Sequence, residues 1–450
     1  MKYLFTFLIL IAAYNYVDAQ TWTKLDGTSS YINAIYMPDN SGTVYVASDI
    51  VPTDLQKNDI QFPNYGAGQQ GFRISKDKGK SFGDEILKDY SVYAFYSYPN
   101  NKNTMLASIR KFNESGIVIS KDAGKTWDMS HIRYISSSQI INITTNKKNS
   151  SKLFAAEVKS SKGYKFTTDT FKTCKTDEQF VIEARDIVTS PFNPNLVFIA
   201  GSKSLHQVYR SRDNGKTWVG NVSGLEGKRI LCLMPSMWNE SVILAGVDSL
   251  DFNRDSHGIG IYMSLDTGKT WKLVGAKGKR VFDLAQHPSN PKYMAAACDS
   301  GSVFFSGSYG YGWEEYSDGL PKKTSVRVVA IADWESGNGA IVLAGTFGKG
   351  LYISKKVITG VKDNTPHSLQ ILSIAPQPFN DLVRIDVSSS FANTIKAEIF
   401  DMLGNNLYSS EKTNNGNVTS FIWQPAYLPN GVYMLRLTNG KDIITTKIIK

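Results

Sequence analysis

Cysteine is scarce in this chain, and the scarcity excludes several classes of protein. Only three of the 450 residues are cysteine, at Cys174, Cys232 and Cys298, so a scaffold held together by several disulfides is excluded. Their spacing fits no zinc motif, and His257 and His287 are isolated, so we expect no metal and no other cofactor. We interpret the cysteines as small buried hydrophobic residues, with one disulfide bridge open as the alternative.

Long apolar runs are also missing, apart from one at the N-terminus. There Lys2 precedes an apolar run from Leu4 to Ala13, and the small-residue sequence "VDA" ends at Ala19. This is the pattern of a secretory signal peptide over residues 1–19, and it is too short for a transmembrane helix. We therefore expect Sec export to the periplasm and no transmembrane segment in the mature chain.

A contiguous basic patch is absent as well, although the formal net charge is +10. Lysines such as Lys125, Lys216 and Lys269 recur singly, each at the same place of a repeated octapeptide. A nucleic-acid interface needs basic residues gathered on one face, often with interleaved aromatics. We expect no nucleic-acid partner.

The octapeptide is the most prominent feature that is present. It reads "SKDKGKSF" from Ser75, "SKDAGKTW" from Ser120, "SRDNGKTW" from Ser211 and "SLDTGKTW" from Ser264, with worn copies from Thr167 and Ser306. Gly-Lys-Thr also ends a phosphate-binding loop, but the glycine that such a loop needs five residues earlier is missing. The pattern instead predicts a turn in which Asp and Ser bond to loop amides and Gly adopts a positive φ. The turn residues are Ser75, Asp77, Gly79, Ser120, Asp122, Gly124, Trp127, Ser211, Asp213, Gly215, Trp218, Ser264, Asp266, Gly268 and Trp271.

A second pattern repeats seven times, about every 45 to 51 residues: a Pro/Asn turn and then a short strand of small residues, as in "SPFNPNLVFIAG" ending at Gly201. Four short strands of period two in each unit are typical of a propeller blade. The last unit stops at Ser354 without its aromatic end, and "TWTKL" from Thr21 supplies one. We predict a seven-bladed β-propeller closed by the N-terminal strand, because a sandwich would not repeat at a fixed period.

Ser-x-Asp-x-Gly-x-x-Trp resembles the Asp box, or BNR repeat, of sialidase-like propellers, sortilins and xyloglucan hydrolases over about residues 21 to 355. The resemblance implies that the octapeptides lie on the face away from the ligand site. The opposite face would carry two inserted segments, 49–70 and 247–260. Such polar, aromatic and Gly-rich segments suit ligand binding, and a solvated loop is the alternative.

Two kinds of site residue are predicted on that face. Asp49 resembles the first catalytic Asp of the xyloglucan hydrolases, and Asp251 or Asp255 would be its partner in a glycosidase. Those enzymes carry the second Asp on a second propeller, however, and the sialidase Arg-Ile-Pro motif ends here in Ser75. The ligand-binding candidates are Arg185, Arg229, Arg280 and Arg327, which would line the channel and hold an anion, or pair with carboxylates such as Glu183 and Asp186.

The last eighty or so residues form a separate, strand-rich unit after a linker. The marks are "PQPFND", "DMLG", "LPNGVYMLRL" and a final lysine. They resemble, in order, the C-terminal sorting domain of the type IX secretion system of Bacteroidetes-type bacteria, which implies an immunoglobulin-like β-sandwich read at the outer membrane. The motif residues are Pro376, Pro378, Phe379, Asp401, Gly404, Leu428, Gly431, Tyr433 and Lys450.

Together these features predict an all-β chain: a signal peptide (1–19), a propeller (20–356), a linker (357–368) and a sorting domain (369–450). The expected location is the outer-membrane surface or the medium, and the expected partner is the type IX machinery. A module that binds an extracellular glycan or protein is favoured over catalysis. A glycoside hydrolase and a purely structural surface protein are the alternatives.

Overall fold

The structure is a computed structural model of the whole chain. It describes residues 22–28, 31–49, 69–98, 100–111, 114–136, 139–146, 148–158, 163–171, 173–176, 184–201, 207–221, 223–249, 258–334, 340–354, 369–389, 394–401, 404–414, 418–425, 427–439 and 443–450. The expected signal peptide, the linker and most of the two inserted segments lie outside these residues. Every regular element among the described residues is a β-strand, in agreement with the predicted all-β class.

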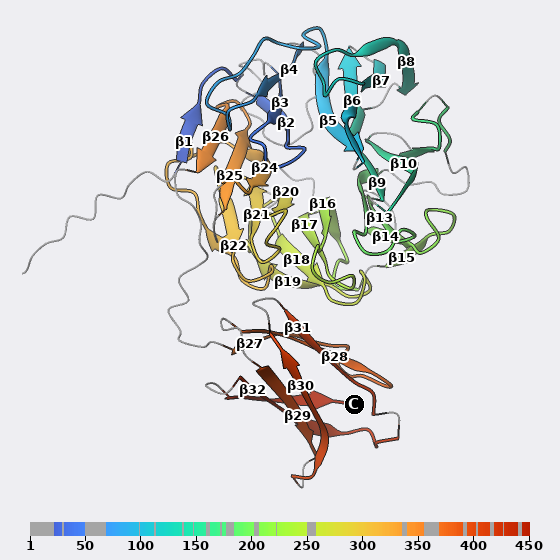
Figure 1. Cartoon of the computed structure of the whole chain (residues 1–450), viewed down its shortest axis with the longest axis vertical. Helices are drawn as coiled ribbons and strands as arrows, with labels where there is room; N and C mark the ends of the chain where they lie inside the picture. Colours follow the sequence, from blue (N-terminus) through green and yellow to red (C-terminus); the bar gives the residue numbers. More distant parts are fainter. Residues whose placement is uncertain are drawn as a thin grey trace, which may run out of the picture.

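Among its described residues, the N-terminal region, residues 22–354, contains five sheets of three or four antiparallel strands and one seven-stranded sheet (Figure 1). The seven-stranded sheet covers residues 31–136, and its two antiparallel parts join through one parallel pair, Gly71 with Ser91. The short strands arise from alternating apolar and polar residues between turn residues. The first sheets contain β2 (Tyr31–Tyr36), β3 (Val44–Asp49), β4 (Gln69–Ser75), β5 (Ser91–Tyr98), β6 (Asn101–Lys111), β7 (Glu114–Ser120), β8 (Asp128–Ser136), β9 (Gln139–Asn146), β10 (Asn149–Val158) and β11 (Tyr164–Thr167). The next contain β12 (Ala184–Thr189), β13 (Val197–Gly201), β14 (Val208–Ser211), β15 (Val219–Asn221), β16 (Lys228–Pro235), β17 (Ile243–Ser249), β18 (Gly260–Ser264) and β19 (Lys272–Gly275). The last contain β20 (Val281–Gln286), β21 (Met294–Cys298), β22 (Val303–Ser306), β23 (Glu314–Glu315), β24 (Val326–Ala332), β25 (Ile341–Thr346) and β26 (Leu351–Ser354).

One strand of each sheet of this region, and two strands of the seven-stranded sheet, touch one another in a cycle; these are the first strands of the repeats. The order of contact is β2, β5, β9, β12, β16, β20, β24 and back to β2. The apolar faces of adjacent sheets are buried against each other, as where Cys232 and Met234 of β16 pack with Met294 and Ala296 of β21. The core is therefore divided into layers between sheets.

The N-terminal strand joins the last sheet of this region. Strand β1 (Trp22–Leu25) pairs antiparallel with β26, with Trp22 opposite Ser354. Trp22 is fully buried, and its indole Nε1 donates a hydrogen bond to the carbonyl oxygen of Tyr316 at 2.9 Å. The two chain segments that the sequence places in one unit thus lie in one sheet.

A β-bulge interrupts each first strand near its start. The residue before the bulge is buried, whereas the extra residue is partly exposed, so the bulge turns one side chain per sheet out of the core. The period-two pattern gave no sign of these insertions. The bulge residues are Asn33, Tyr93, Ile141, Arg185, Leu231, Phe282 and Arg327.

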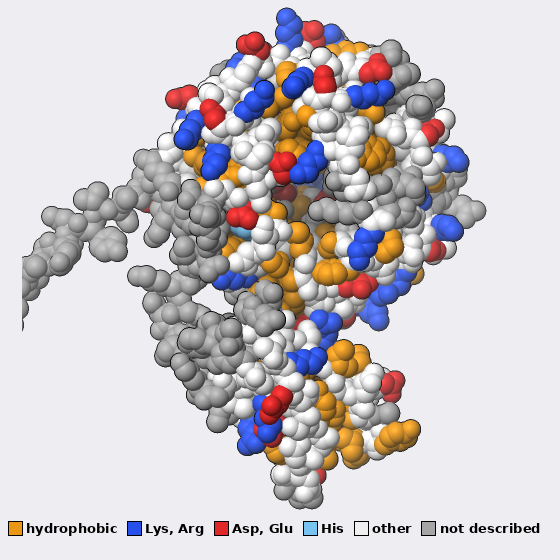
Figure 2. Space-filling view, in the orientation of Figure 1, with side chains coloured by type: hydrophobic (Ala, Val, Ile, Leu, Met, Phe, Trp, Pro, Cys, Tyr) orange, Lys and Arg blue, Asp and Glu red, His pale blue; other side chains and the backbone are white. Residues whose placement is uncertain are grey.

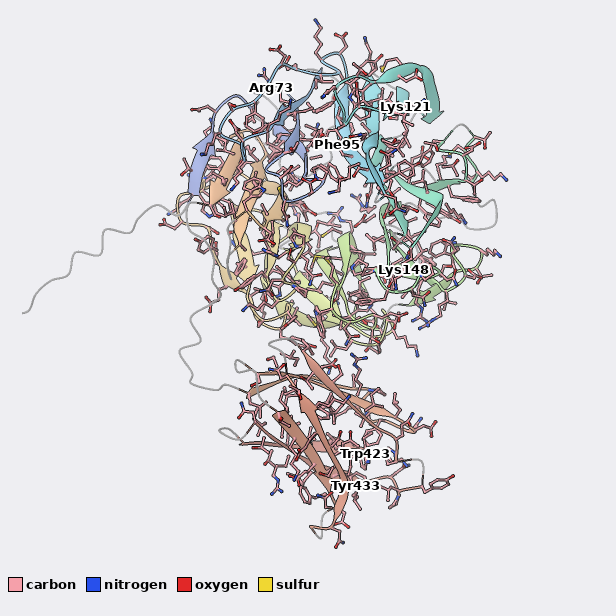
Figure 3. All side chains as sticks on the ribbon, viewed as in Figure 1. Arg73, Phe95, Lys121, Lys148, Trp423 and Tyr433 are labelled. Atoms are coloured by element: carbon pink, nitrogen blue, oxygen red, sulfur yellow. The ribbon has the colours of Figure 1, made fainter. Side chains whose placement is uncertain are left out.

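The C-terminal region, residues 369–450, consists of two sheets that share one core. Figure 3 shows Trp423 and Tyr433 side by side there, with ring centroids 5.4 Å apart. One sheet contains β27 (Leu369–Ala375), β28 (Val383–Ser389) and β31 (Thr419–Trp423). The other contains β30 (Asn406–Thr413), β29 (Thr394–Phe400), β32 (Val432–Thr438) and β33 (Ile443–Ile449).

Candidate functional site

The octapeptides form turns held by their own side chains. In the copy at Ser211, the Ser211 hydroxyl donates to Asp213 Oδ1 at 2.7 Å and accepts the amide of Gly215 at 2.7 Å. The amide and hydroxyl of Thr217 donate to the two carboxylate oxygens of Asp213 at 2.8 and 2.5 Å. Gly215 has a φ of 74°, which glycine adopts without strain. These residues serve the turn itself.

The worn copy at Thr167 keeps the same bonds with different residues. The Thr167 hydroxyl donates to Asp169 at 2.6 Å and accepts the amide of Phe171 at 3.2 Å. Phe171 takes the glycine position with a φ of 60°. In the copy at Ser120, hydrogen bonds from Thr126 hold the pKa of Asp122 at about 2. The turn is therefore defined by its hydrogen bonds more than by its letters.

The opposite end of each second strand carries the other predicted residues. Ser264 pairs with Ile243 at one end of β17, and Asp248 pairs with Arg229 at the other end. Five residues of strand separate the two ends by about 17 Å. In several repeats, the equivalent position lies five residues along the second strand from the residue that faces the first octapeptide residue. These positions hold Asp49, Arg110, Asp248, Asp299 and Phe347, each in a different repeat. This end is chemically varied where the turn end is uniform.

Two of the four predicted arginines meet at one buried carboxylate. Asp248 is fully buried, and its Oδ2 contacts both a guanidinium nitrogen of Arg229 and Nε of Arg280, the latter at 3.1 Å. The Arg229 and Arg280 side chains keep 15% and 10% of their surface exposed. A second carboxylate lies close by, because Oδ1 of Asp299 accepts the Arg280 amide at 3.3 Å. Sequence reasoning paired the arginines with Glu183 or Asp186 and missed Asp248, whose place opposite Arg229 follows from the register.

One inserted segment begins and ends at this arginine pair. Gly258 closes it, and a Cβ added there would lie 1.8 Å from the amide nitrogen of Arg280, so the chain returns directly against that backbone. Asp251 and Asp255 lie outside the described residues. Asp49 ends β3 at the corresponding place, where it pairs with Tyr31 and Gln69. Asp49 is therefore the only one of the three predicted aspartates among the described residues, and no pair of them is described.

Arg185 and Arg327 occupy a different kind of position. Both are bulge residues, and the Arg327 guanidinium lies 4.0 Å from the ring centroid of Phe282 and 5.1 Å from that of Phe347. Such cation–π contacts hold the guanidinium in place. The predicted set of four therefore divides into an ion-paired couple and two bulge residues.

Two carboxyls that the sequence did not single out as a pair, one buried and one half-buried, link neighbouring sheets. Asp186 accepts the amide of Leu233 at 2.8 Å, and Asp283 accepts the amide of Val329 at 2.9 Å. Each follows a bulge residue, and each reaches the first strand of the next sheet. Burial raises the pKa of Asp186 to about 6 and that of Asp283 to about 7, against the opposing effect of these hydrogen bonds.

The positions of two cysteines agree with the predicted burial, whereas the third is only partly buried. Cys232 and Cys298 are buried, Cys174 is half-buried, and all three are free thiols. Figure 2 shows basic and acidic side chains interspersed over the visible face of the N-terminal region, and in Figure 3 Lys121 lies toward the rim while Phe95 lies toward the centre. The described part of the chain holds no helix with the length and apolarity of a membrane span.

Solved structures similar to the chain are propeller-like. A GH74 xyloglucanase from Xanthomonas campestris is 11% identical with a TM-score of 0.56; the match covers 82% of this chain and 59% of the enzyme. A GH74 enzyme from Niastella koreensis is 13% identical with a TM-score of 0.54 and coverages of 95% and 68%. YCF48 bound to D1 peptide is 14% identical with a TM-score of 0.51 and coverages of 75% and 97%. At these identities the likeness shows the fold alone.

The clearest comparison concerns the C-terminal region. No curated protein sequence is significantly similar to the chain. Residues 373–450, however, match the family described as "Secretion system C-terminal sorting domain". The chain therefore carries a type IX sorting tail, which directs export to the cell surface or secretion in Bacteroidetes-type bacteria.

Proposed function

We propose that the chain is an exported protein whose N-terminal region is a closed, seven-bladed propeller that binds an extracellular ligand on the face opposite the octapeptide turns. The cycle of contacts between first strands and the pairing of β1 with β26 support closure. The match to residues 373–450 supports delivery outside the cell. The octapeptides act as Asp-box turns and leave the other face to carry function.

The ligand carries acidic groups, and the Arg229–Asp248–Arg280 cluster is the observation that carries this proposal. Asp248 contacts both guanidinium groups, so their planar groups are oriented in advance. Planar guanidinium groups bind carboxylates through two parallel hydrogen bonds. Gly258, which follows the inserted segment, lies directly against the backbone of Arg280.

Binding is tested with a carbohydrate array that includes neutral, uronate and sulfated glycans, followed by calorimetry on each hit. Arg280→Lys keeps a counter-charge for Asp248 but removes the planar fork. We expect at least a tenfold loss of affinity for that variant. Arg212→Lys, an exposed arginine of an octapeptide turn, is the matched control and should bind as the natural protein does. Equal affinity of both variants would refute the arginine site.

Catalysis is the second candidate function, because two GH74 enzymes share the fold and Asp49 ends β3 on the same side as the arginines. Asp248 is held between two guanidinium groups and is unsuited to act as the acid. Release of reducing sugar from xyloglucan, abolished in Asp49→Ala with binding kept, would establish hydrolysis. If no glycan binds, an acidic peptide is the next probe, and failure of both leaves a structural surface protein.

Export is tested by removing residues 373–450 from the expressed chain. The truncated protein should accumulate in the periplasm, whereas the full chain reaches the surface or medium. Cell fractionation and protease shaving of intact cells measure the difference. Normal delivery of the truncation would mean that the sorting tail does not direct this chain.

A further inference from the structure

Two aromatic motif residues of the sorting domain face inward, whereas both prolines of its first motif are exposed. Phe379 is 1% exposed, and its ring lies 5.6 Å from that of Trp423, which in turn contacts Tyr433 (Figure 3). The amide of Phe379 donates to the carbonyl of Ile449 at 3.0 Å. Buried side chains cannot be what another protein touches first. The two buried aromatic residues therefore act by shaping a neighbouring part of the surface.

The part of the surface that these residues shape is the short segment between β31 and β32. The ammonium group of Lys450, the last residue, donates to the carbonyl oxygens of Pro425 and Leu428, each at 2.6 Å. The Tyr433 hydroxyl donates to the carbonyl of Pro429 at 2.6 Å, and Gly431 exchanges two backbone hydrogen bonds with Lys450. Three bonds from a cation and a buried phenol, together with two backbone bonds, fix a loop that has no regular structure of its own.

The segment presents a large aromatic ring outward, beside the exposed Pro429 and Asn430. Tyr427 is 101% exposed, the highest value among the large apolar side chains that the structure describes as exposed. An isolated exposed apolar residue is ordinary on a protein surface. Here Pro425 and Leu428, on either side of Tyr427, are held by the last residue of the chain, Lys450. A rigid, amphipathic tyrosine often contributes much of the binding energy of protein interfaces.

The outer side of the second sheet is a weaker candidate. Glu398 accepts from Arg436 at 2.8 Å and lies 3.2 Å from the Lys396 ammonium. These charges already satisfy one another along the surface, and removing them from water would cost free energy without a gain in pairing.

We propose that the segment Tyr427–Gly431 is the surface through which the type IX machinery recognises the sorting domain, with the Tyr427 ring entering an apolar pocket of a machinery protein. The motif residues Phe379, Tyr433 and Lys450 hold the segment in its binding shape. The inference rests on the sorting role of residues 373–450.

The test is Tyr427→Ala in the full chain, expressed in the bacterium that exports it. Because the ring is fully exposed, the melting temperature of the purified variant should stay within about 1 °C of the natural protein. Surface delivery should fall at least tenfold, with the protein accumulating in the periplasm. Tyr427→Phe, which keeps the ring, should retain most delivery.

Ile422→Ala is the matched control, because Ile422 is 49% exposed in the same domain but lies on β31. It should be delivered normally. Delivery of Tyr427→Ala at the natural level, or an equal loss in Ile422→Ala, would overturn the proposal. Delivery of a chain lacking residues 373–450 would instead overturn the sorting role itself, so the two failures are distinguishable.

Lys450→Met tests the holding role separately. It removes the two bonds to Pro425 and Leu428 while keeping a long side chain. We expect faster protease cleavage near Tyr427 and a delivery loss smaller than that of Tyr427→Ala. Unchanged cleavage together with unchanged delivery would show that the segment is not held by the terminal lysine.

Discussion

The two ends of the propeller sheets follow opposite rules. At the turn end, hydroxyl, aspartate and backbone make the same bonds even where Thr167 replaces serine and Phe171 replaces glycine. At the other end, equivalent positions hold Asp49, Arg110 or Asp248 in different repeats. All copies belong to one chain and one fold, so the fold itself does not demand this variety. Such variety is what the proposed binding face would require.

At the turn end, we expect Trp22→Ala to lower the free energy of unfolding the most. Trp22 is fully buried and completes the last unit from the other end of the chain. Truncating a buried tryptophan costs about 3 to 5 kcal/mol, measured by denaturant unfolding. Trp313→Ala is the control, since Trp313 is half-buried at the end of a worn copy. If both variants lost the same amount, β1 would not be closing the ring.

Asp248→Asn breaks the other end. It leaves Arg229 and Arg280 beside each other without their shared counter-charge, and we expect a loss of about 3 kcal/mol in the free energy of unfolding. Asp213→Asn, at the partly exposed turn end, should lose clearly less. The comparison would be wrong if the turn aspartate mattered more for stability than Asp248.

The sequence predicted the turn end well and the other end poorly, for a physical reason. A turn is a local object, so eight letters contain most of its bonds. The Arg229–Asp248 contact depends on strand register, and the strand "RVFDLAQH" gives no sign of its bulge at Phe282. Without the bulge, Asp283 would share the buried face of Val281. With it, the carboxylate reaches the amide of Val329 in the next sheet.

The sorting domain shows the same division. The order of its motifs was enough to predict its role, which the match to residues 373–450 supports. The inward direction of Phe379 and the anchoring of Lys450 at Pro425 depend on contacts between distant segments. These contacts leave no local pattern in the sequence.

Aspartates at the turns and those between the sheets should titrate with opposite effects on stability. Asp122, with a pKa of about 2, adds stability above its ordinary pKa and loses it as pH falls through 2. Asp186 and Asp283, raised to about 6 and 7, add stability below the ordinary pKa and lose it as pH rises through those values. Each of these two carboxyls contributes a slope of up to roughly 1.4 kcal/mol per pH unit.

We therefore expect the free energy of unfolding to fall from pH 5 to pH 7. Denaturant titrations at pH 4, 5, 6 and 7 measure it for the natural chain and for Asp283→Asn, which removes the steeper contribution. The variant is less stable at pH 5, because Asp283 accepts the amides of both Leu284 and Val329 and asparagine offers only one acceptor oxygen, but its curve should be flatter. Parallel curves would show that Asp283 does not titrate in this range.

Exchanging residues between copies gives the smallest effect and the finest test of uniformity at the turn end. Thr267 and Asn214 occupy the same octapeptide position with φ values of 62° and 58°. Their amides bond alike, to the carbonyls of Ser241 and Asn195 at 2.8 and 2.9 Å. A β-branched residue is strained at positive φ, whereas asparagine is tolerated. Thr267→Asn should therefore stabilise the chain by about 0.5 to 1 kcal/mol, and Asn214→Thr should destabilise it by a similar amount. Because the bonds around the two positions correspond, the two changes should nearly cancel in the double variant. A double variant that differed from the natural chain by more than either single change would mean that the copies are not interchangeable even here.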